Sequence, residues 1–304
     1  MYLHENEELF KNIIERTKEN TGFDLEIIEK DYYVTMILQL IVKKSLGLGD
    51  VVFKGGTSLS KCHKVIDRFS EDIDITFTEH LGDKRRKKLK YDVMKNLSDE
   101  LNIPITNWNQ IQSNRDLNAY SFYYKPLFNE NYDALIKGVK VETALASYSF
   151  PTEAMLISSY VGDFLLKTQP ELAKRHCLEP FEMKTQSLSR TFIDKVYATC
   201  DYYLQGKTQR LSRHIYDLHK IFPRMKFDDE FKRLVKEVKA LRAQMDICPS
   251  AKPGVNVSQL IQKYCTEDFY KADFEIITDT LINEDISYSK VIETMLKIAS
   301  FDFW

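Results

Sequence analysis

Several features are missing from this chain of 304 residues. It has no apolar run long enough to span a bilayer, which argues against a membrane protein. Its first residues are acidic and amphipathic, unlike a signal peptide. Its five cysteines are odd in number and widely spaced, with no CxxC pair, so neither a disulfide framework nor a zinc site is expected. These absences predict a cytoplasmic protein with reduced thiols and no membrane partner.

An excess of either charge is also missing. The 43 basic and 45 acidic residues leave a net charge of −2, so no global positive field can attract nucleic acid. Any such contact must come from a local patch, and the main candidate is a basic run, defined as Lys84, Arg85, Arg86, Lys87 and Lys88. The alternative interpretation of this run is a solvated helix face.

Hydrophobic periodicity predicts an α+β protein whose second half is helical. Helix is expected over 1–47 with a break at Thr21–Gly22, and again from Thr57 and over 84–101. Strands are expected at 51–53, 73–77, 103–112, 117–127 and 138–146. After Pro151 the helical segments are 153–167, 187–205, 210–222, 228–245, 257–283 and 286–299. The predicted domains are an N-terminal helical layer at 1–50, an α/β core at 51–150 and a helical domain at 151–304.

The most informative segment begins where the first strand meets a glycine turn. Two adjacent glycines allow the backbone to approach a ligand closely, and the helix that follows offers N–H groups to phosphate. Hydroxyls in the first turn and a lysine one turn later could bind the same anion. The candidate nucleotide-binding residues are Lys54, Gly55, Gly56, Thr57, Ser58 and Lys61.

Two carboxylates follow on the next strand. Asp72 and Asp74 flank Ile73, so both side chains are expected on the same face. Carboxylates this close repel one another unless a cation lies between them, and hard divalent ions prefer oxygen ligands. A pair of such ions can organise an in-line phosphoryl displacement, so the sequence predicts a metal site beside a phosphate-binding turn.

The glycine turn followed by Asp-x-Asp resembles the DNA polymerase β-like nucleotidyltransferase superfamily. The fuller pattern resembles the AbiEii/AbiGii toxin family of bacterial abortive-infection and toxin–antitoxin systems. Three further segments carry this resemblance, namely Glu29–Tyr33, Arg190–Lys195 and Arg213–Leu218. Together the motifs cover roughly residues 25–222 in the order of the family.

The resemblance implies a polymerase β-like nucleotidyltransferase core with N-terminal helices and a C-terminal helical domain. It implies two Mg²⁺ ions held by Asp72, Asp74 and a third carboxylate, for which Glu142 is the candidate. A surface pair with Lys140 is the alternative for Glu142. The motifs also imply that Lys195 neutralises the triphosphate of an NTP and that Asp217 orients Lys195 or the acceptor. For Asp217 the alternative is an ion pair with Arg213 one turn away.

The activity implied is transfer of a nucleotide from an NTP to an acceptor hydroxyl, with the 3′ end of a tRNA as the acceptor. The family resemblance also implies a toxin controlled by an antitoxin encoded nearby. A protein or a small molecule is the alternative acceptor, and a regulator that binds nucleotide or RNA without catalysis is the alternative class. The intact Asp-x-Asp favours catalysis, because a pure binder gains nothing from two repelling carboxylates. The charged triplet Glu29–Lys30–Asp31 is expected to pack the N-terminal helices against the catalytic sheet.

Overall fold

The computed structural model describes the chain except residues 69, 129–137, 146–149, 279–281 and 283. The described residues form two compact units. Unit 1 comprises Met1–Cys62 and Ser70–Gln186, and unit 2 comprises His63–Phe69 and Ser187–Trp304. This division differs from the three predicted domains, because the N-terminal helices share one unit with the sheet and the sheet continues beyond residue 150. No helix in the described part of the chain is long and apolar enough to cross a membrane.

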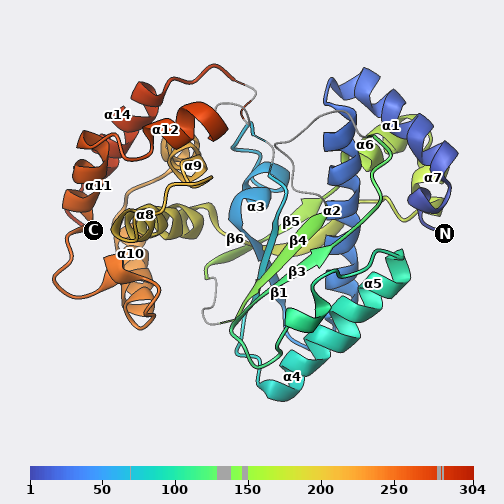
Figure 1. The fold of residues 1–304 in the computed structure, drawn as a ribbon, viewed down its shortest axis with the longest axis horizontal. Helices are drawn as coiled ribbons and strands as arrows, with labels where there is room; N and C mark the ends of the chain where they lie inside the picture. The colour runs from blue at the N-terminus through green and yellow to red at the C-terminus, as the bar shows by residue number, and fades with distance from the viewer. Residues whose placement is uncertain (69, 129–137, 146–149, 279–281, 283) are drawn as a thin grey trace. The chain divides into compact units, whose positions relative to one another are not determined.

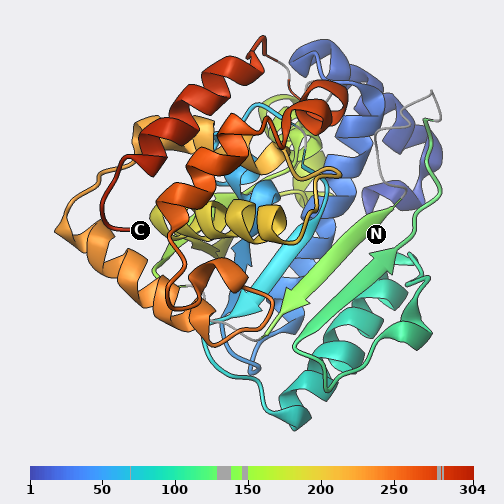
Figure 2. The same cartoon turned by 60° about the vertical axis from the view of Figure 1, so that its left-hand side comes forward.

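A mixed sheet organises unit 1. Its strands, among the described residues, are β1 (Val51–Lys54), β2 (Ile73–Phe77), β3 (Leu117–Phe122), β4 (Val139–Ala144), β5 (Thr152–Ile157) and β6 (Phe181–Gln186). Their order across the sheet is β3-β4-β2-β1-β6-β5. The pairs β2/β4 and β1/β6 are parallel, whereas the other three are antiparallel. Figure 2 shows β2, β4 and β3 side by side.

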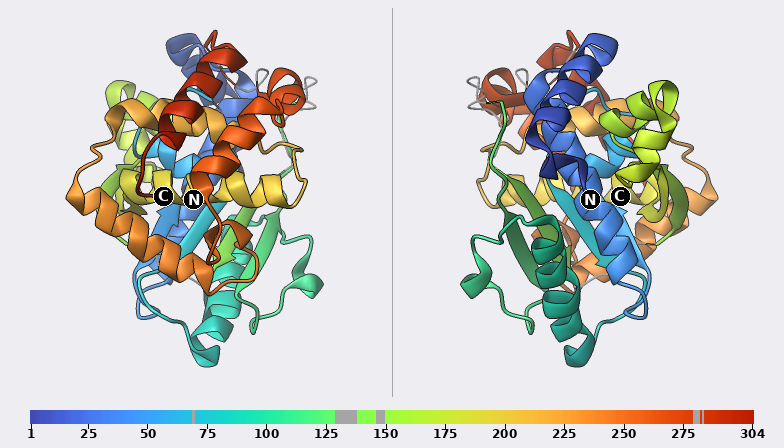
Figure 3. Two further views of the ribbon diagram at one scale, coloured as in Figure 1. Left: turned by 90° about the vertical axis from the view of Figure 1, so that its left-hand side faces the viewer. Right: turned by 90° about the vertical axis from the view of Figure 1, so that its right-hand side faces the viewer.

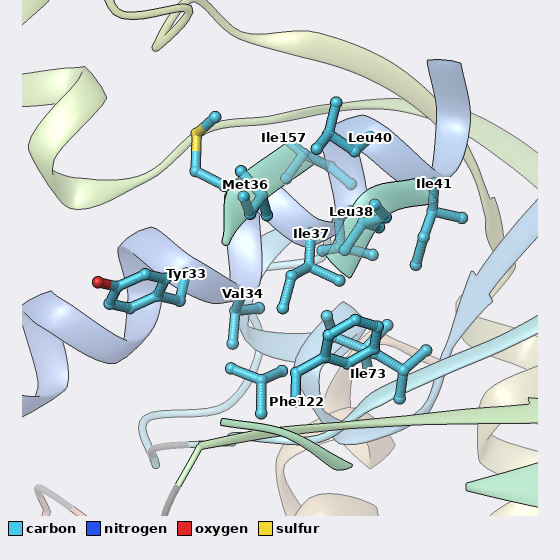
Figure 4. Close-up of a cluster of buried hydrophobic side chains, with 14 of the residues drawn as sticks. Tyr33, Val34, Met36, Ile37, Leu38, Leu40, Ile41, Ile73, Phe122 and Ile157 are labelled. Carbon is cyan, nitrogen blue, oxygen red and sulfur yellow. The ribbon is translucent and has the colours of Figure 1, made fainter. Parts of the chain in front are cut away.

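The helices of unit 1 begin with η1 (Leu3–Glu5), α1 (Glu7–Thr21) and α2 (Leu25–Lys44). The predicted break is confirmed, because Gly22 ends α1 in the left-handed conformation with φ of 78°. Helix α2 is buried over almost its whole length, and more of the core side chains labelled in Figure 4 come from α2 than from any other element. Ile73 of β2, Phe122 of β3 and Ile157 of β5 belong to the same core (Figure 4). A helix that is buried on all sides lies at the centre of its domain rather than on its surface.

The other helices of unit 1 surround this core. They are α3 (Gly55–Lys61), α4 (Asp83–Lys88), η2 (Leu89–Lys95), α5 (Asn96–Leu101), η3 (Trp108–Gln110), α6 (Tyr160–Thr168) and α7 (Pro170–Arg175). The predicted basic helix is confirmed as the succession α4, η2 and α5, in which η2 has π-helical geometry. Helix α2 contacts both η2 and α5, and Figure 3 (right) shows these helices beside one another on the sheet.

Two of the predicted elements are wrong. The run 103–112 forms no strand, because only Ile105 makes an isolated bridge and η3 occupies part of it. The first half of the predicted helix 153–167 is strand β5, which pairs along its length with β6. A short apolar run has no periodicity that separates helix from strand, so a distant pairing partner decides its structure.

Unit 2 is helical, as predicted for this part of the chain. Its helices are α8 (Leu188–Leu204), α9 (Arg213–Ile221), η4 (Phe222–Arg224), α10 (Asp229–Ala243), η5 (Pro249–Ala251), α11 (Val257–Thr266), α12 (Lys271–Asp273), η6 (Phe274–Thr278) and α14 (Tyr288–Ala299). Figure 1 shows α8 and α10 together, with α11 and α14 beside them. The predicted helix 257–283 is interrupted after Thr266.

Candidate active site

A row of charged residues crosses three neighbouring strands of unit 1. Lys54 at the end of β1 pairs with Asp74 of β2, and Asp74 pairs with Glu142 of β4. Residues that are directly opposite on neighbouring strands point to the same face of a sheet. Asp72 precedes β2 by one residue and alternation places it on the face of Asp74. We call this surface, formed by Asp72, Asp74 and Glu142, the carboxylate face.

Gly55 lies directly against the carboxylate face. Its φ of 78° belongs to the left-handed region, and a Cβ added there would lie 2.0 Å from Asp74 Oδ2. Only glycine therefore allows the turn to approach the Asp74 carboxylate this closely. The structure thus brings the predicted turn and the predicted carboxylates together.

Lys140 is a cation beside the carboxylate face. It lies two residues before Glu142 on β4, and its ammonium forms an ion pair with the Glu142 carboxylate. Burial lowers the pKa of Lys140, but the hydrogen bond and charge of Glu142, with the charges of Asp72 and Asp74, outweigh this effect and raise it. The alternative pairing considered for Glu142 is therefore present.

The carboxylate face fits hard divalent ions in its chemistry, because all three side chains offer oxygen ligands. Within the described ranges, however, no group of three or more His, Cys, Asp or Glu side chains is placed to hold a metal ion. Glu142 is turned toward Lys140 in this arrangement. Lys140 therefore holds Oε1, one of the two oxygens that Glu142 could offer to an ion.

The hydroxyl groups of Thr57 and Ser58 form hydrogen bonds within the protein. Thr57 Oγ1 donates its one hydroxyl hydrogen to the main-chain oxygen of Asp72 and accepts from Ser70 Oγ at 3.0 Å. Ser58 Oγ donates to the Gly55 carbonyl oxygen at 2.9 Å. Both side chains are buried. These bonds fix Asp72 relative to the turn, and they leave the backbone as the part of Gly55–Ser58 best suited to meet a phosphate.

Lys61 is held in a similar way. Its ammonium donates to Asp31 Oδ1 at 2.5 Å, to Thr35 Oγ1 at 2.8 Å and to the Ser158 carbonyl oxygen at 3.1 Å. An ammonium has three N–H donors, so these three bonds use all of them. This geometry favours a role for Lys61 in anchoring α3 to α2 over direct contact with a phosphate.

The charged triplet of α2 is buried, and each residue holds a different segment. Glu29 Oε1 accepts from the Leu127 N–H at 2.9 Å. Lys30 pairs with Glu71 at 2.5 Å, one residue before Asp72, and Asp31 pairs with Lys61. The expected packing role is confirmed, because these contacts tie α2 to the segments that flank the carboxylate face. Burial raises the pKa of Glu29 to about 7, although two backbone N–H groups donate to the carboxylate and oppose this shift.

In unit 2 the structure brings Lys195 and Asp217 together. Lys195 Nζ lies 2.7 Å from Asp217 Oδ2, and Arg68 donates to both oxygens of the same carboxylate at 2.7 Å. The Asp217 side chain is fully buried. Burial alone would raise the pKa of Asp217, but the charges of Arg68 and Lys195 hold it well below its usual range. Asp217 is therefore an anionic anchor for two cations, Arg68 and Lys195.

His214 completes this cluster. Its Nδ1 lies 3.2 Å from Lys195 Nζ and accepts a hydrogen bond, because an ammonium can only donate. Burial, and then the nearby charges of Lys195 and Arg213, hold the pKa of His214 well below its usual value, so the ring is neutral. Burial likewise lowers the pKa of Lys195 despite the opposing charge of Asp217.

Sequence reasoning missed Arg68 as a partner of Asp217 and considered Lys140 only as a surface partner of Glu142. Arg68 lies far from Asp217 along the chain, so no local pattern connects the two residues. A usable signal did exist for Lys140, since residues two apart on a strand share a face. The roles of all these residues toward nucleotide and metal stay predictions.

Comparison with known proteins agrees with the motifs. The family model described as "Nucleotidyl transferase AbiEii toxin, Type IV TA system" matches residues 39–296. No curated protein matches. Among solved structures, JHP933 from Helicobacter pylori is 14% identical with a TM-score of 0.44, and the match covers 86% of this chain and 87% of that one.

A second structure, of a candidate nucleotidyltransferase from H. pylori, is 16% identical with a TM-score of 0.43. The match covers 88% of this chain and 93% of that one. Both TM-scores are low, so identification rests on the family match. The glycine turn, the carboxylate face and this match define a nucleotidyltransferase. The chain belongs to the family of AbiEii nucleotidyltransferase toxins of type IV toxin–antitoxin systems.

Proposed function

We propose that this protein transfers a nucleotide from an NTP to an acceptor hydroxyl in a reaction that depends on divalent metal. The observation that carries the proposal is the row formed by Asp74 and Glu142 on neighbouring strands, with Gly55 against Asp74. In the reaction the acceptor oxygen forms a bond to the α-phosphorus while the bond from that phosphorus to the bridging oxygen breaks. The hydroxyl proton is released and pyrophosphate leaves.

Asp72, Asp74 and Glu142 would hold two Mg²⁺ ions. When bound, such ions neutralise charge on the triphosphate and lower the pKa of an attacking hydroxyl. The backbone of Gly55–Ser58 would meet the phosphates, and Lys54 on β1 lies on the same face as Asp74. These residues supply binding, orientation and fixed charge rather than covalent chemistry.

Lys195 is proposed to neutralise the triphosphate, on the strength of its motif. Within unit 2 its ammonium is oriented by Asp217 and by the neutral His214. Because Asp217 is fully buried and binds two cations, we propose that it orients Lys195 rather than the acceptor. Asp217 is then a positioning residue.

The acceptor proposed is the 3′ end of a tRNA, with an antitoxin encoded nearby, because the family is one of type IV toxin–antitoxin toxins. The basic run supplies a local positive surface suited to an RNA backbone, since Lys84, Lys87 and Lys88 are exposed. Two cavities of unit 1, of about 490 and 360 Å³, are lined by other residues than the carboxylate face. Neither therefore adds support for a small-molecule acceptor beside these carboxylates.

The test is incubation of the protein with each labelled NTP, Mg²⁺ and total RNA, followed by separation of labelled RNA. We expect label to enter RNA of tRNA size with wild-type protein. Asp72→Asn and Asp74→Asn should melt at nearly the wild-type temperature yet lose transfer, because each removes one metal-binding charge and relieves like-charge repulsion. More than about a tenth of wild-type turnover in either variant would exclude the metal assignment. Label in protein or in a small molecule would instead identify the alternative acceptors.

A further inference from the structure

Lys140 and Glu142 form an ion pair on the exposed side of β4. Their side chains are 38% and 31% exposed, so water reaches both. Exposed ion pairs contribute little to folding, which makes stability a weak reason for this pair. Its position is more informative, because Glu142 is one of three residues of the carboxylate face.

The register of β2 and β4 places this pair against the other two carboxylates. Ile73 pairs with Val141 and Asp74 with Glu142, so the residues that precede these pairs in the two segments are Asp72 and Lys140. The Lys140 ammonium contacts the Glu142 carboxylate, and Glu142 lies on the same face of the sheet as Asp74. Like charges held this close repel one another, and one flexible lysine reduces that repulsion.

We propose that Lys140 is the resident counter-ion of the carboxylate face, holding Glu142 when no divalent ion is bound and competing with such an ion for that carboxylate. The proposal rests on the proposed function, since it assumes that Asp72, Asp74 and Glu142 bind metal. Lys140 is suited to this role because its long side chain is partly exposed and can move into water. It therefore lowers the affinity of the nucleotide-free protein for divalent ions.

A purely structural role gives a different expectation. If Lys140 only strengthened β4, its loss would destabilise the fold and leave the affinity for metal unchanged or weaker. If it compensates the carboxylates, its loss strengthens metal binding even when the metal-free protein becomes less stable. Metal affinity and stability then change in opposite directions, which separates the two roles.

The experiment is a titration of nucleotide-free protein with Mn²⁺, in which electron paramagnetic resonance measures the free ion. We expect Lys140→Met to bind Mn²⁺ about tenfold more tightly than wild type, since one repelling unit charge is removed from the site. Lys140→Arg keeps the charge and should bind within about twofold of wild type. Lys184→Met is the matched control, because Lys184 pairs with Asp50 in the same sheet, at the end of β1 away from Gly55.

Thermal unfolding with and without Mn²⁺ supplies a second measurement. Lys140→Met should melt below wild type without metal and gain more from Mn²⁺, because a ligand that binds the folded state more tightly raises its stability more at the same concentration. If Lys140→Met and Lys184→Met both bind like wild type while Asp74→Asn loses binding, Lys140 is no counter-ion and the metal site stands. If wild type and Lys140→Met both bind no more Mn²⁺ than Asp74→Asn, the metal site itself is absent and both proposals fail.

Discussion

At the scale of single residues, Gly55 connects the turn to the carboxylate face. Two separate constraints favour glycine at this position. Its backbone is in the left-handed region, and an added Cβ would clash with Asp74 Oδ2. Gly56 does not share the positive φ. The two neighbouring glycines are therefore unequal, although the sequence presents them as one pair.

Gly55→Ala is expected to destabilise the protein by about 1–2 kcal/mol or more, through the left-handed conformation and displacement of the Asp74 carboxylate. The rate of nucleotide transfer should fall by more than this loss of stability explains, because the added side chain displaces the Asp74 carboxylate. Gly56→Ala is the matched control and should unfold close to wild type. Urea unfolding and transfer assays on both variants check this. Equal losses of unfolding free energy for the two substitutions would contradict the assignment to Gly55.

At the scale of the element, α2 positions the segments around the site with buried charges. Glu29, Lys30 and Asp31 each lie in the interior and each has a partner from another segment. Removing one partner of a buried ion pair lowers the free energy of unfolding by more than the intact pair contributes, because the other charge stays buried without compensation. The carboxylate face thus depends on a helix that contributes no residue to it.

Glu29 gives α2 a predictable pH dependence. Its pKa rises from 4.5 to about 7 in the folded protein, so the folded state keeps a proton that the unfolded state loses. This contribution to stability is largest below pH 4.5 and is lost as the pH rises to about 7. Glu29→Gln should remove this slope and keep the acceptor for the Leu127 N–H. Urea unfolding of both proteins across that range checks it, and an unchanged slope would contradict it.

The basic run behaves as two groups within one helix. Arg85 donates to the Leu48 carbonyl oxygen at 3.0 Å, and the buried Arg86 pairs with Asp116 at 2.8 Å. Lys84, Lys87 and Lys88 are exposed instead. The arginines therefore serve the fold, and the three lysines are the part of the run able to meet RNA.

Replacing Lys84, Lys87 and Lys88 together with Ser should weaken RNA binding without unfolding the protein. The salt dependence of binding should flatten by roughly one unit of slope for each RNA phosphate that the variant no longer neutralises. The matched control replaces the exposed Lys232, Arg233 and Lys236 of α10, which removes the same charge elsewhere. RNA binding across a salt titration measures both variants. Equal slopes for the two would identify the run as a solvated helix face.

At the scale of the whole molecule, unit 2 has its own core. Aromatic rings of α8, η4, α10, the segment between η4 and α10, and the C-terminal residues pack together, namely Phe192, Phe222, Phe227, Phe231, Phe301, Phe303 and Trp304. Phe192 lies on α8, three residues before Lys195. The residues after 222, for which the sequence offered no motif, thus support the helix that carries Lys195.

Phe231→Ala is expected to destabilise unit 2 by about 3–5 kcal/mol, because a buried ring leaves a cavity among its neighbours. Leu241→Ala on the same helix is the control, since Leu241 is exposed and should cost far less. Thermal unfolding, followed by near-ultraviolet circular dichroism of the aromatic residues, measures both. A melting temperature equal to that of the control would show that the aromatic cluster does not stabilise unit 2.

The sequence alone determined the local parts of this protein. Strand alternation places Asp72 and Asp74 on one face, and a strand followed by glycines places a turn beside them, because these relations span only a few residues. Helical periodicity likewise predicted α2 and the basic helix. The α+β class followed from these local patterns, and the mixed sheet with its helices confirms it.

Only the tertiary structure decided the relations between distant residues. The register of β2 and β4 sets Glu142 beside Asp74, and a slip of one residue would have turned Glu142 to the other face. Because β5 pairs with β6, the segment predicted as the start of a helix is a strand. Arg68 forms an ion pair with Asp217, although the two residues are far apart in the sequence. Each of these outcomes depends on which distant segments contact one another in the folded protein, and local sequence periodicity does not determine those contacts.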